Sequence, residues 1–143
     1  MVRARAGADW SRSSSRVRES IGPFVYPARR MTRPPVFRIL TNESGSRVEI
    51  AIEGELDMAT APQLEAEFQR VGALEGVELA VVDLRELAFL DSSGLEAIVK
   101  FESRSRAAGV EVVLVRGPRA VERLFSVMQL DKKLRIVDDP VEI

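Results

Sequence analysis

"ELAVVDLRELAFLDSSGLEAIVKFESRSRAAGVEVVLV", residues 78 to 115, is the stretch of sequence that decides the fold. It begins and ends with short Val-rich runs, at 78 to 84 and 110 to 115, which are nearly continuous in apolar residues, as strands covered on both faces are. Apolar residues from Leu95 to Phe101 recur at helical spacing, and Gly109 is typical of a helix end. The stretch therefore predicts a βαβ crossover in which the two strands are parallel neighbours.

The residues before this unit predict a hairpin and a helix. Runs at 36 to 41 and 47 to 54 flank a turn-forming segment, and the second run alternates large apolar residues with Glu and Ala. This pattern indicates a hairpin with one solvated face. Thr60, with Gln63 three residues later, forms a capping-box pattern, which predicts a helix over 61 to 73.

The residues after the unit predict a third helix and a last strand. Apolar residues from Val121 to Met128 keep the spacing of one helix face, and "LRIV" at 134 to 137 indicates a short strand. The predicted order is β-β-α-β-α-β-α-β. We therefore expect an α/β fold with a central, mostly parallel sheet of four to five strands, an N-terminal hairpin and helices packed against the sheet.

The composition narrows the classes of function. The chain of 143 residues has no Cys and no His. Their absence removes disulfides, thiol nucleophiles, thiolate and imidazole metal ligands, and the usual general base near neutral pH. We therefore predict that the chain is not an enzyme, holds no metal and needs no cofactor.

The charge is distributed unevenly along the chain. Residues 1 to 33 hold 8 Arg against 2 acidic residues, which leaves 13 basic and 20 acidic residues from position 34 onward. An acidic domain argues against nucleic acid as the main partner, because phosphate backbones are bound by clustered Lys and Arg. The sequence contains no run of about eighteen apolar residues, which is the length that a membrane-spanning helix needs. A protein partner is expected.

The basic segment at 1 to 33 is predicted to lie outside the domain. It is rich in Arg and Ser without a sustained period, so we expect a largely disordered tail, or sequence upstream of a real start at Met31. It lacks the apolar stretch of a signal peptide, which together with the absence of Cys predicts a cytoplasmic protein. The domain is expected to span 34 to 143.

The candidate site is "FLDSSGL" at 89 to 95, because ligands of parallel sheets bind beyond the carboxyl ends of strands. A nucleophile elbow would need a G-x-S-x-G pattern and a His, and neither is present. A phosphate-binding loop would need a Gly-rich pattern, which is absent from the sequence, and Asp91 would repel a bound phosphate. The roles that remain for this motif are a helix cap and a phosphorylation site.

The two serines of the motif are expected to divide these roles. Ser93 and Glu96 form a capping box, worth about 1 kcal/mol to the helix. One helix needs one cap, so Ser92 is left with an unassigned hydroxyl that a kinase could reach. A phosphate on Ser92 would be favoured by the helix end and opposed by Asp91, so we expect the fold to survive and the bound partner to be affected.

Four motifs in the chain resemble the STAS domain family, specifically the stand-alone bacterial anti-sigma factor antagonists. They are "GELD" at 54 to 57, "DL" at 83 to 84, "FLDSSGL" at 89 to 95, and "RLF" at 123 to 125 ahead of a Leu-Asp near the last strand. The resemblance covers residues 36 to 139. The basic segment before this range has no counterpart in the family, and the helix with which members usually finish is absent after the last strand.

The resemblance implies a regulator without catalysis of its own. Members of the family bind an anti-sigma factor that is also a serine kinase, and they displace its sigma factor. The kinase uses ATP to phosphorylate the serine that follows the Asp of the motif, and a phosphatase reactivates the protein. That serine is Ser92 here, with Ser93 as the alternative.

The expected partner-binding residues are Asp57, Asp91, Ser92, Ser93 and Gly94. Asp57 matches a family position near the phosphosite, with a plain turn or cap residue as the alternative. Asp91 could orient the site for the kinase or merely favour the turn, and Gly94 leaves room for a close approach.

A second function stays open at this point, that of a constitutive STAS scaffold in a larger assembly of the lipid-transport or stressosome type. For either function we expect a monomer or weak dimer, without direct contact to nucleic acid or membrane.

Overall fold

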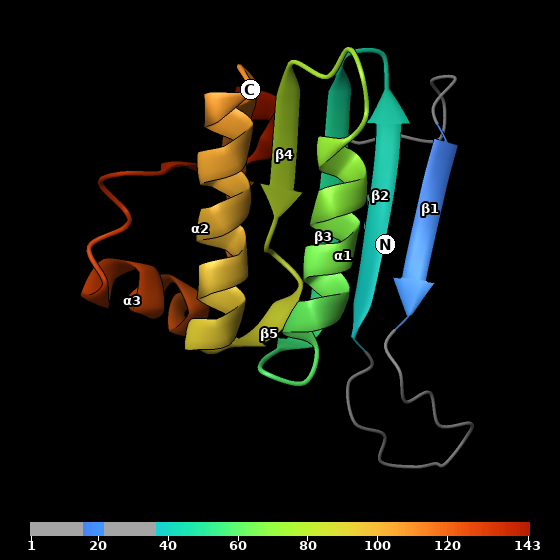
Figure 1. Cartoon of the computed structure of the whole chain (residues 1–143). Helices are drawn as coiled ribbons and strands as arrows, with labels where there is room; N and C mark the ends of the chain where they lie inside the picture. The colour runs from blue at the N-terminus through green and yellow to red at the C-terminus, as the bar shows by residue number, and fades with distance from the viewer. Residues whose placement is uncertain (1–15, 22–36) are drawn as a thin grey trace.

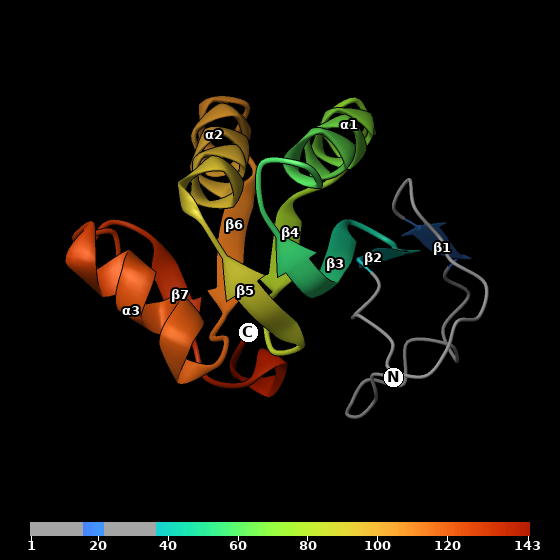
Figure 2. The ribbon, with the colours of Figure 1, turned by 90° about the horizontal axis from the view of Figure 1, so that it is seen from below.

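The computed structural model describes residues 16 to 21 and 37 to 143. The elements in chain order are β1 (Arg16–Ile21), β2 (Arg38–Ser44), β3 (Arg47–Leu56), α1 (Ala61–Gly72), β4 (Leu79–Asp83), β5 (Leu87–Leu90), α2 (Ser92–Ala107), β6 (Glu111–Val115), α3 (Arg119–Val127), β7 (Arg135–Val137) and a 3-10 helix (Pro140–Glu142). Helices α1 and α2 lie side by side on one face of the sheet, and α3 lies beyond α2 (Figure 1, Figure 2). None of the helices in these two ranges is long and apolar enough to cross a membrane.

The strands pair in the order β1-β2-β3-β4-β6-β7, and β5 pairs with the far end of β3. The pairs β1–β2 and β2–β3 are antiparallel, and all the others are parallel. The predicted α/β fold, with a mostly parallel sheet, an N-terminal hairpin and packed helices, is confirmed. The sheet is larger than expected because the sequence patterns did not predict β1 and β5.

Strand β1 corrects part of the expectation that residues 1 to 33 are disordered. Arg16–Ile21 pairs with β2 along its whole length. The physical reason lies in the free edge of β2, whose unpaired N–H and C=O groups offer hydrogen bonds to an extended segment of any composition. The rest of this stretch, including the start predicted at Met31, lies outside the described residues.

The single strand expected at 78 to 84 is followed by a turn and by a second strand, β5. The carboxylate of Asp83 accepts a hydrogen bond from the backbone N–H of Arg85 at 3.0 Å and pairs with its guanidinium at 2.8 Å. This turn moves the chain along β3, so that β4 pairs with Arg47–Ala51 and β5 pairs with Gly54–Leu56. β3 is thus shared by two consecutive strands, and the second leads directly into α2.

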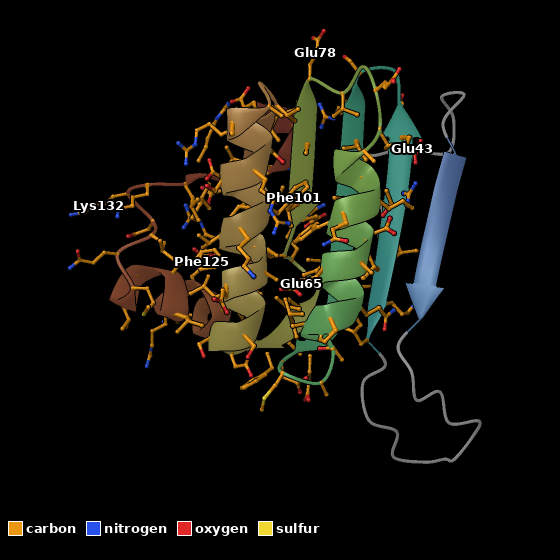
Figure 3. All side chains as sticks on the ribbon, viewed as in Figure 1. Glu43, Glu65, Glu78, Phe101, Phe125 and Lys132 are labelled. Atoms are coloured by element: carbon orange, nitrogen blue, oxygen red, sulfur yellow. The ribbon has the colours of Figure 1, made fainter. Side chains whose placement is uncertain are left out.

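One apolar core lies between the sheet and the helices α1 and α2. On β3, the side chains of Val48, Ile50 and Ile52 alternate toward this core and are completely buried. The rings of Phe68 on α1 and Phe101 on α2 stack with their centroids 4.1 Å apart, and Figure 3 labels Phe101 between the two helices. The core therefore fixes both helices on the sheet, together with the loops that precede them.

The parallel strands all end at one edge of the sheet, which Figure 2 shows from below. Both α1 and α2 begin at this edge, the first after β3 and the second after β5. Because sites in parallel sheets lie beyond the carboxyl ends of the strands, this edge is where the candidate residues are expected to meet.

Candidate functional site

Two loops meet at the carboxyl edge of the sheet, one after β3 and one after β5. Leu56 and Leu90, the last residues of these strands, are paired in the parallel register. The backbone N–H of Asp91 donates to the carbonyl of Leu56 at 3.2 Å. The sheet therefore brings together Asp57 and the Asp91-Ser92-Ser93 motif, although 34 positions separate the two Asp residues in the sequence.

Asp91 is the N-cap of α2. Its backbone is extended, with φ −111° and ψ −175°, and its Oδ1 accepts hydrogen bonds from the N–H groups of Ser93 at 2.9 Å and Gly94 at 3.0 Å. The capping box predicted for Ser93 and Glu96 is therefore wrong. Ser93 lies inside the helix, because the carboxylate one position before Ser92 already satisfies the first free N–H groups.

Ser92 is the first residue of α2, and its side chain is exposed. Within the described part of the chain, its hydroxyl makes no hydrogen bond. The hydroxyl of Ser93 is also without a partner there, but Ser93 is half-buried. Of the two candidate serines, Ser92 is thus the more accessible to an enzyme that approaches from solvent.

Gly94 is buried, so the close approach predicted for it involves the core rather than the surface. A Cβ on Gly94 would lie 2.5 Å from Cγ of Leu56 and 2.8 Å from Cδ1 of Leu90. Real Cβ contacts are not that short, so only glycine lets the first turn of α2 rest on the ends of β3 and β5. The structure gives Gly94 a packing role beneath the site.

The loop after β3 is held by Asp57. Its Oδ1 accepts hydrogen bonds from the N–H groups of Ala59 at 2.9 Å and Thr60 at 3.1 Å. Thr60 occupies the N-cap position of α1, but its side chain makes no capping hydrogen bond; it donates instead to the carbonyl of Glu55 at 2.9 Å. The capping box predicted from Thr60 therefore does not form, and Asp57 builds the turn.

Two apolar side chains that sequence reasoning missed accompany these polar residues. Met58, in the loop after β3, is 73% exposed, and Phe89, on β5, is 48% exposed. Met58 directly follows Asp57 in the sequence, and Phe89 stands two positions before Asp91. The sequence could have indicated these two residues through their position, since each is a large apolar residue close to a turn-forming Asp.

The described residues contain no group of three or more metal-binding side chains. The site consists of hydroxyls, turn-forming carboxylates and exposed apolar side chains. Such a surface is suited to binding a protein and to accepting a modification.

Comparison with known proteins places these features in a family. Residues 38 to 142 match the model of the STAS domain. The Osmosensory protein A of Mycobacterium tuberculosis is 33% identical over 75 residues, which cover 52% of this chain and 46% of that protein. The anti-sigma-B factor antagonist of Listeria monocytogenes is 30% identical over 89 residues, covering 62% of this chain and 77% of that one.

A solved structure agrees with these matches. The crystal structure of an anti-sigma factor antagonist from Mycobacterium paratuberculosis superposes with a TM-score of 0.63 at 27% identity, covering 73% of this chain and 87% of that chain. The chain spans slightly under half the length of the Osmosensory protein A that it matches. The match to the family model extends over most of the described residues, from β2 to the last helical turn. The chain belongs to the STAS domain family.

Proposed function

We propose that the protein is an anti-sigma factor antagonist that is switched by phosphorylation of Ser92. The unphosphorylated form binds an anti-sigma factor that is also a serine kinase, and this binding releases the sigma factor. The observation that carries the proposal is the exposed hydroxyl of Ser92 at the start of α2, which has no hydrogen-bond partner among the described residues and lies on an edge that also carries two exposed apolar side chains. Anti-sigma factor antagonists among the similar proteins support the general role.

Phosphorylation of Ser92 requires no rearrangement of the site. The γ-phosphoryl group of ATP, the cofactor of the kinase, passes to Oγ of Ser92, ADP leaves, and the kinase accepts the hydroxyl proton. Because the cap of α2 comes from Asp91, the reaction breaks no hydrogen bond that starts the helix. The positive end of the helix favours the new phosphate by about 0.3 to 1 kcal/mol.

The effect of the phosphate falls on the bound partner. Met58 and Phe89 would be buried in the complex, so water would be excluded from the surface around Ser92. A group of about −2 charge in such a contact loses its hydration, and each ~1.4 kcal/mol of that cost weakens binding about tenfold. A phosphatase then restores the binding form.

The same geometry supports roles that we propose for the other predicted residues. Asp57 and Asp91 hold the two loops beside Ser92 through their Oδ1 atoms, and we propose that their other carboxylate oxygens contact the partner. Ser93 is the secondary acceptor, and Gly94 allows the helix start to approach the sheet. We propose no catalytic step, no nucleic acid and no membrane contact for this chain, which acts as a cytoplasmic monomer or weak dimer.

A constitutive scaffold is the second candidate function, and the exposed apolar pair would serve it equally well. The decisive test incubates the full chain with a candidate anti-sigma factor kinase and ATP, and then locates phosphate by mass spectrometry. We expect one phosphate, on Ser92, lost in Ser92→Ala and kept in the matched variant Ser93→Ala. Absence of phosphate from both serines would favour the scaffold.

Binding of the unphosphorylated chain should depend on the apolar pair. Truncating a hot-spot side chain near the centre of an interface costs about 2 kcal/mol or more. We therefore expect Met58→Ser and Phe89→Ser each to weaken binding to the kinase at least tenfold in calorimetry, with unfolding unchanged. Val141→Ser is the matched control, because Val141 is 76% exposed on the C-terminal helical turn. Equal losses in all three variants would contradict the assigned surface.

A further inference from the structure

A cavity of about 310 Å³ lies between the last turns of α1 and α2. Volumes of roughly 300 to 1,000 Å³ are typical of small-molecule sites. Arg104, which lines the cavity, follows Ser92 by 12 positions on the same helix. At about 1.5 Å per residue the two are separated by roughly 18 Å along the helix axis. The cavity is therefore separate from the surface proposed to bind the anti-sigma factor.

The walls of the cavity are mostly apolar. Both helices and the ends of neighbouring strands contribute, with Phe68, Val71, Leu74, Val77, Phe101 and Val110 among the lining residues. Phe101 is labelled between the two helices in Figure 3. A site of this kind takes a ligand whose main part is a hydrocarbon.

Two polar side chains of α2 mark one end of the cavity. Ser105 is only 8% exposed, and its hydroxyl makes no hydrogen bond with any residue that the structure describes. This hydroxyl can therefore donate a hydrogen bond to a group bound in the cavity. Arg104 is exposed and forms no ion pair within the described ranges, whereas Arg106 is held by Glu102 at 3.2 Å.

The charge of the residues that line the cavity indicates which ligands it favours. Arg104 is the one charged residue among those that line the cavity, and no carboxylate is present in the lining. The carbonyls at the end of α2 are occupied by backbone donors: the carbonyl of Ser105 accepts from Ala108 at 3.0 Å and from Val110 at 2.8 Å. These hydrogen bonds reduce the negative end of the helix dipole that would otherwise repel an anion.

We propose that this cavity binds a carboxylic acid with a linear hydrocarbon chain, of the medium-chain fatty acid class. The hydrocarbon lies along the apolar walls between the helices. The carboxylate pairs with the guanidinium of Arg104 and accepts a hydrogen bond from the hydroxyl of Ser105. This site is independent of the proposed phosphorylation, because it shares no residue with the carboxyl edge of the sheet.

The test titrates the ¹⁵N-labelled full chain with sodium octanoate and follows the backbone amides by NMR. We expect saturable shifts at Ala73 and Ala108, which line the cavity, and none at Ser92. Octanol keeps the chain but lacks the charge, and acetate keeps the charge but lacks the chain. Both should bind at least about tenfold more weakly, because a charge-assisted hydrogen bond or the buried hydrocarbon is lost.

Three variants separate the site from general effects of the additive. Arg104→Gln should weaken octanoate about tenfold, whereas Arg123→Gln, a matched exposed arginine on α3 without an ion pair to any described residue, should leave it unchanged. Ala108→Leu should block the cavity while the spectrum stays that of a folded protein. Octanoate shifts that are absent, spread over the whole surface, or equal in Arg104→Gln and the parent would overturn the proposal.

Discussion

At the scale of single residues, the start of α2 depends on the carboxylate of Asp91. Replacing it by Ala removes both hydrogen bonds to the helix N–H groups, and loss of an N-cap costs about 1 kcal/mol. We expect this loss for Asp91→Ala in urea unfolding, and only a few tenths of a kcal/mol for Asp91→Asn, which keeps an acceptor. An equal loss in both variants would assign the effect to charge instead.

Gly94 makes a second residue-level prediction. In Gly94→Ala the new methyl group would meet Leu56 and Leu90, and overpacking of a tight core costs about 1 to 3 kcal/mol. A methyl group added at Gly72, at the end of α1, would have no neighbouring atom within 4 Å, so Gly72→Ala should be stabilising by about 0.4 to 1 kcal/mol. Thermal unfolding of the two variants should move in opposite directions.

The candidate motif could be located in the sequence at the residue scale, but its helix cap was predicted at the wrong residue. Asp and Ser are both favoured N-caps, and the motif offers Asp91, Ser92 and Ser93 in succession. The apolar spacing of a helix fixes its face but not its first residue. The extended backbone at Asp91 makes this residue the N-cap of α2, and it follows from the pairing of Leu90 with β3.

At the scale of elements, β3 carries a buried carboxylate. Glu49 is 7% exposed, and burial raises its pKa above the ordinary value of 4.5, despite the opposing effect of Arg47, whose Nε lies 2.5 Å from Oε2. Its Oε1 has no hydrogen-bond partner among the described residues. Asp83 on β4 adds to the rise in this pKa, and the nearby Arg85 reduces it.

The direction of the pKa shift determines how the contribution of Glu49 to stability changes with pH. A carboxyl group with a raised pKa binds its proton more tightly in the folded state, so its contribution to stability is complete below pH 4.5 and is lost as the pH rises through the folded value. The unfolding free energy of the parent relative to Glu49→Gln should therefore fall as the pH rises above about 4.5. A difference that stays constant, or rises, in urea titrations across that range would contradict this linkage.

The elements also show why β5 could not be predicted. Residues 78 to 90 contain no Gly or Pro between the two strands, so the sequence has no conventional turn signal there. The turn is made by the side chain of Asp83 closing on Arg85. The long apolar strands and the helices were predictable because their burial imposes a period, whereas a four-residue strand is too short to show one.

At the scale of the whole molecule, the apolar core of the residues whose burial the structure describes lies between Phe37 and Leu134. A chain that begins at Met31 should therefore fold. It would lack β1 and expose the backbone of β2, and free sheet edges promote association. We expect cooperative unfolding by circular dichroism, and concentration-dependent dimers in light scattering that the full chain does not form. An unfolded truncated chain would show that β1 belongs to the core.

The α/β architecture was predictable at this scale because two βαβ units leave few topologies for a chain of this length. The position of β1 was not, because its arginine-containing sequence, RVRESI, satisfies a compositional criterion for disorder. Pairing with an existing edge depends on backbone groups that nearly every sequence has. Composition is therefore a poor guide where a neighbouring strand supplies the hydrogen bonds.

The sharing of β3 between two strands has a consequence for how the molecule opens. β4 and β6 each have a neighbour on both sides, but β5 pairs with β3 alone among the described strands, over three residue positions, as the edge strand β7 does with β6. Native proteins open first where the fewest hydrogen bonds must break. Brief local unfolding should therefore include β5 and the first turn of α2, and it would present Ser92 as extended chain while the central strands stay intact.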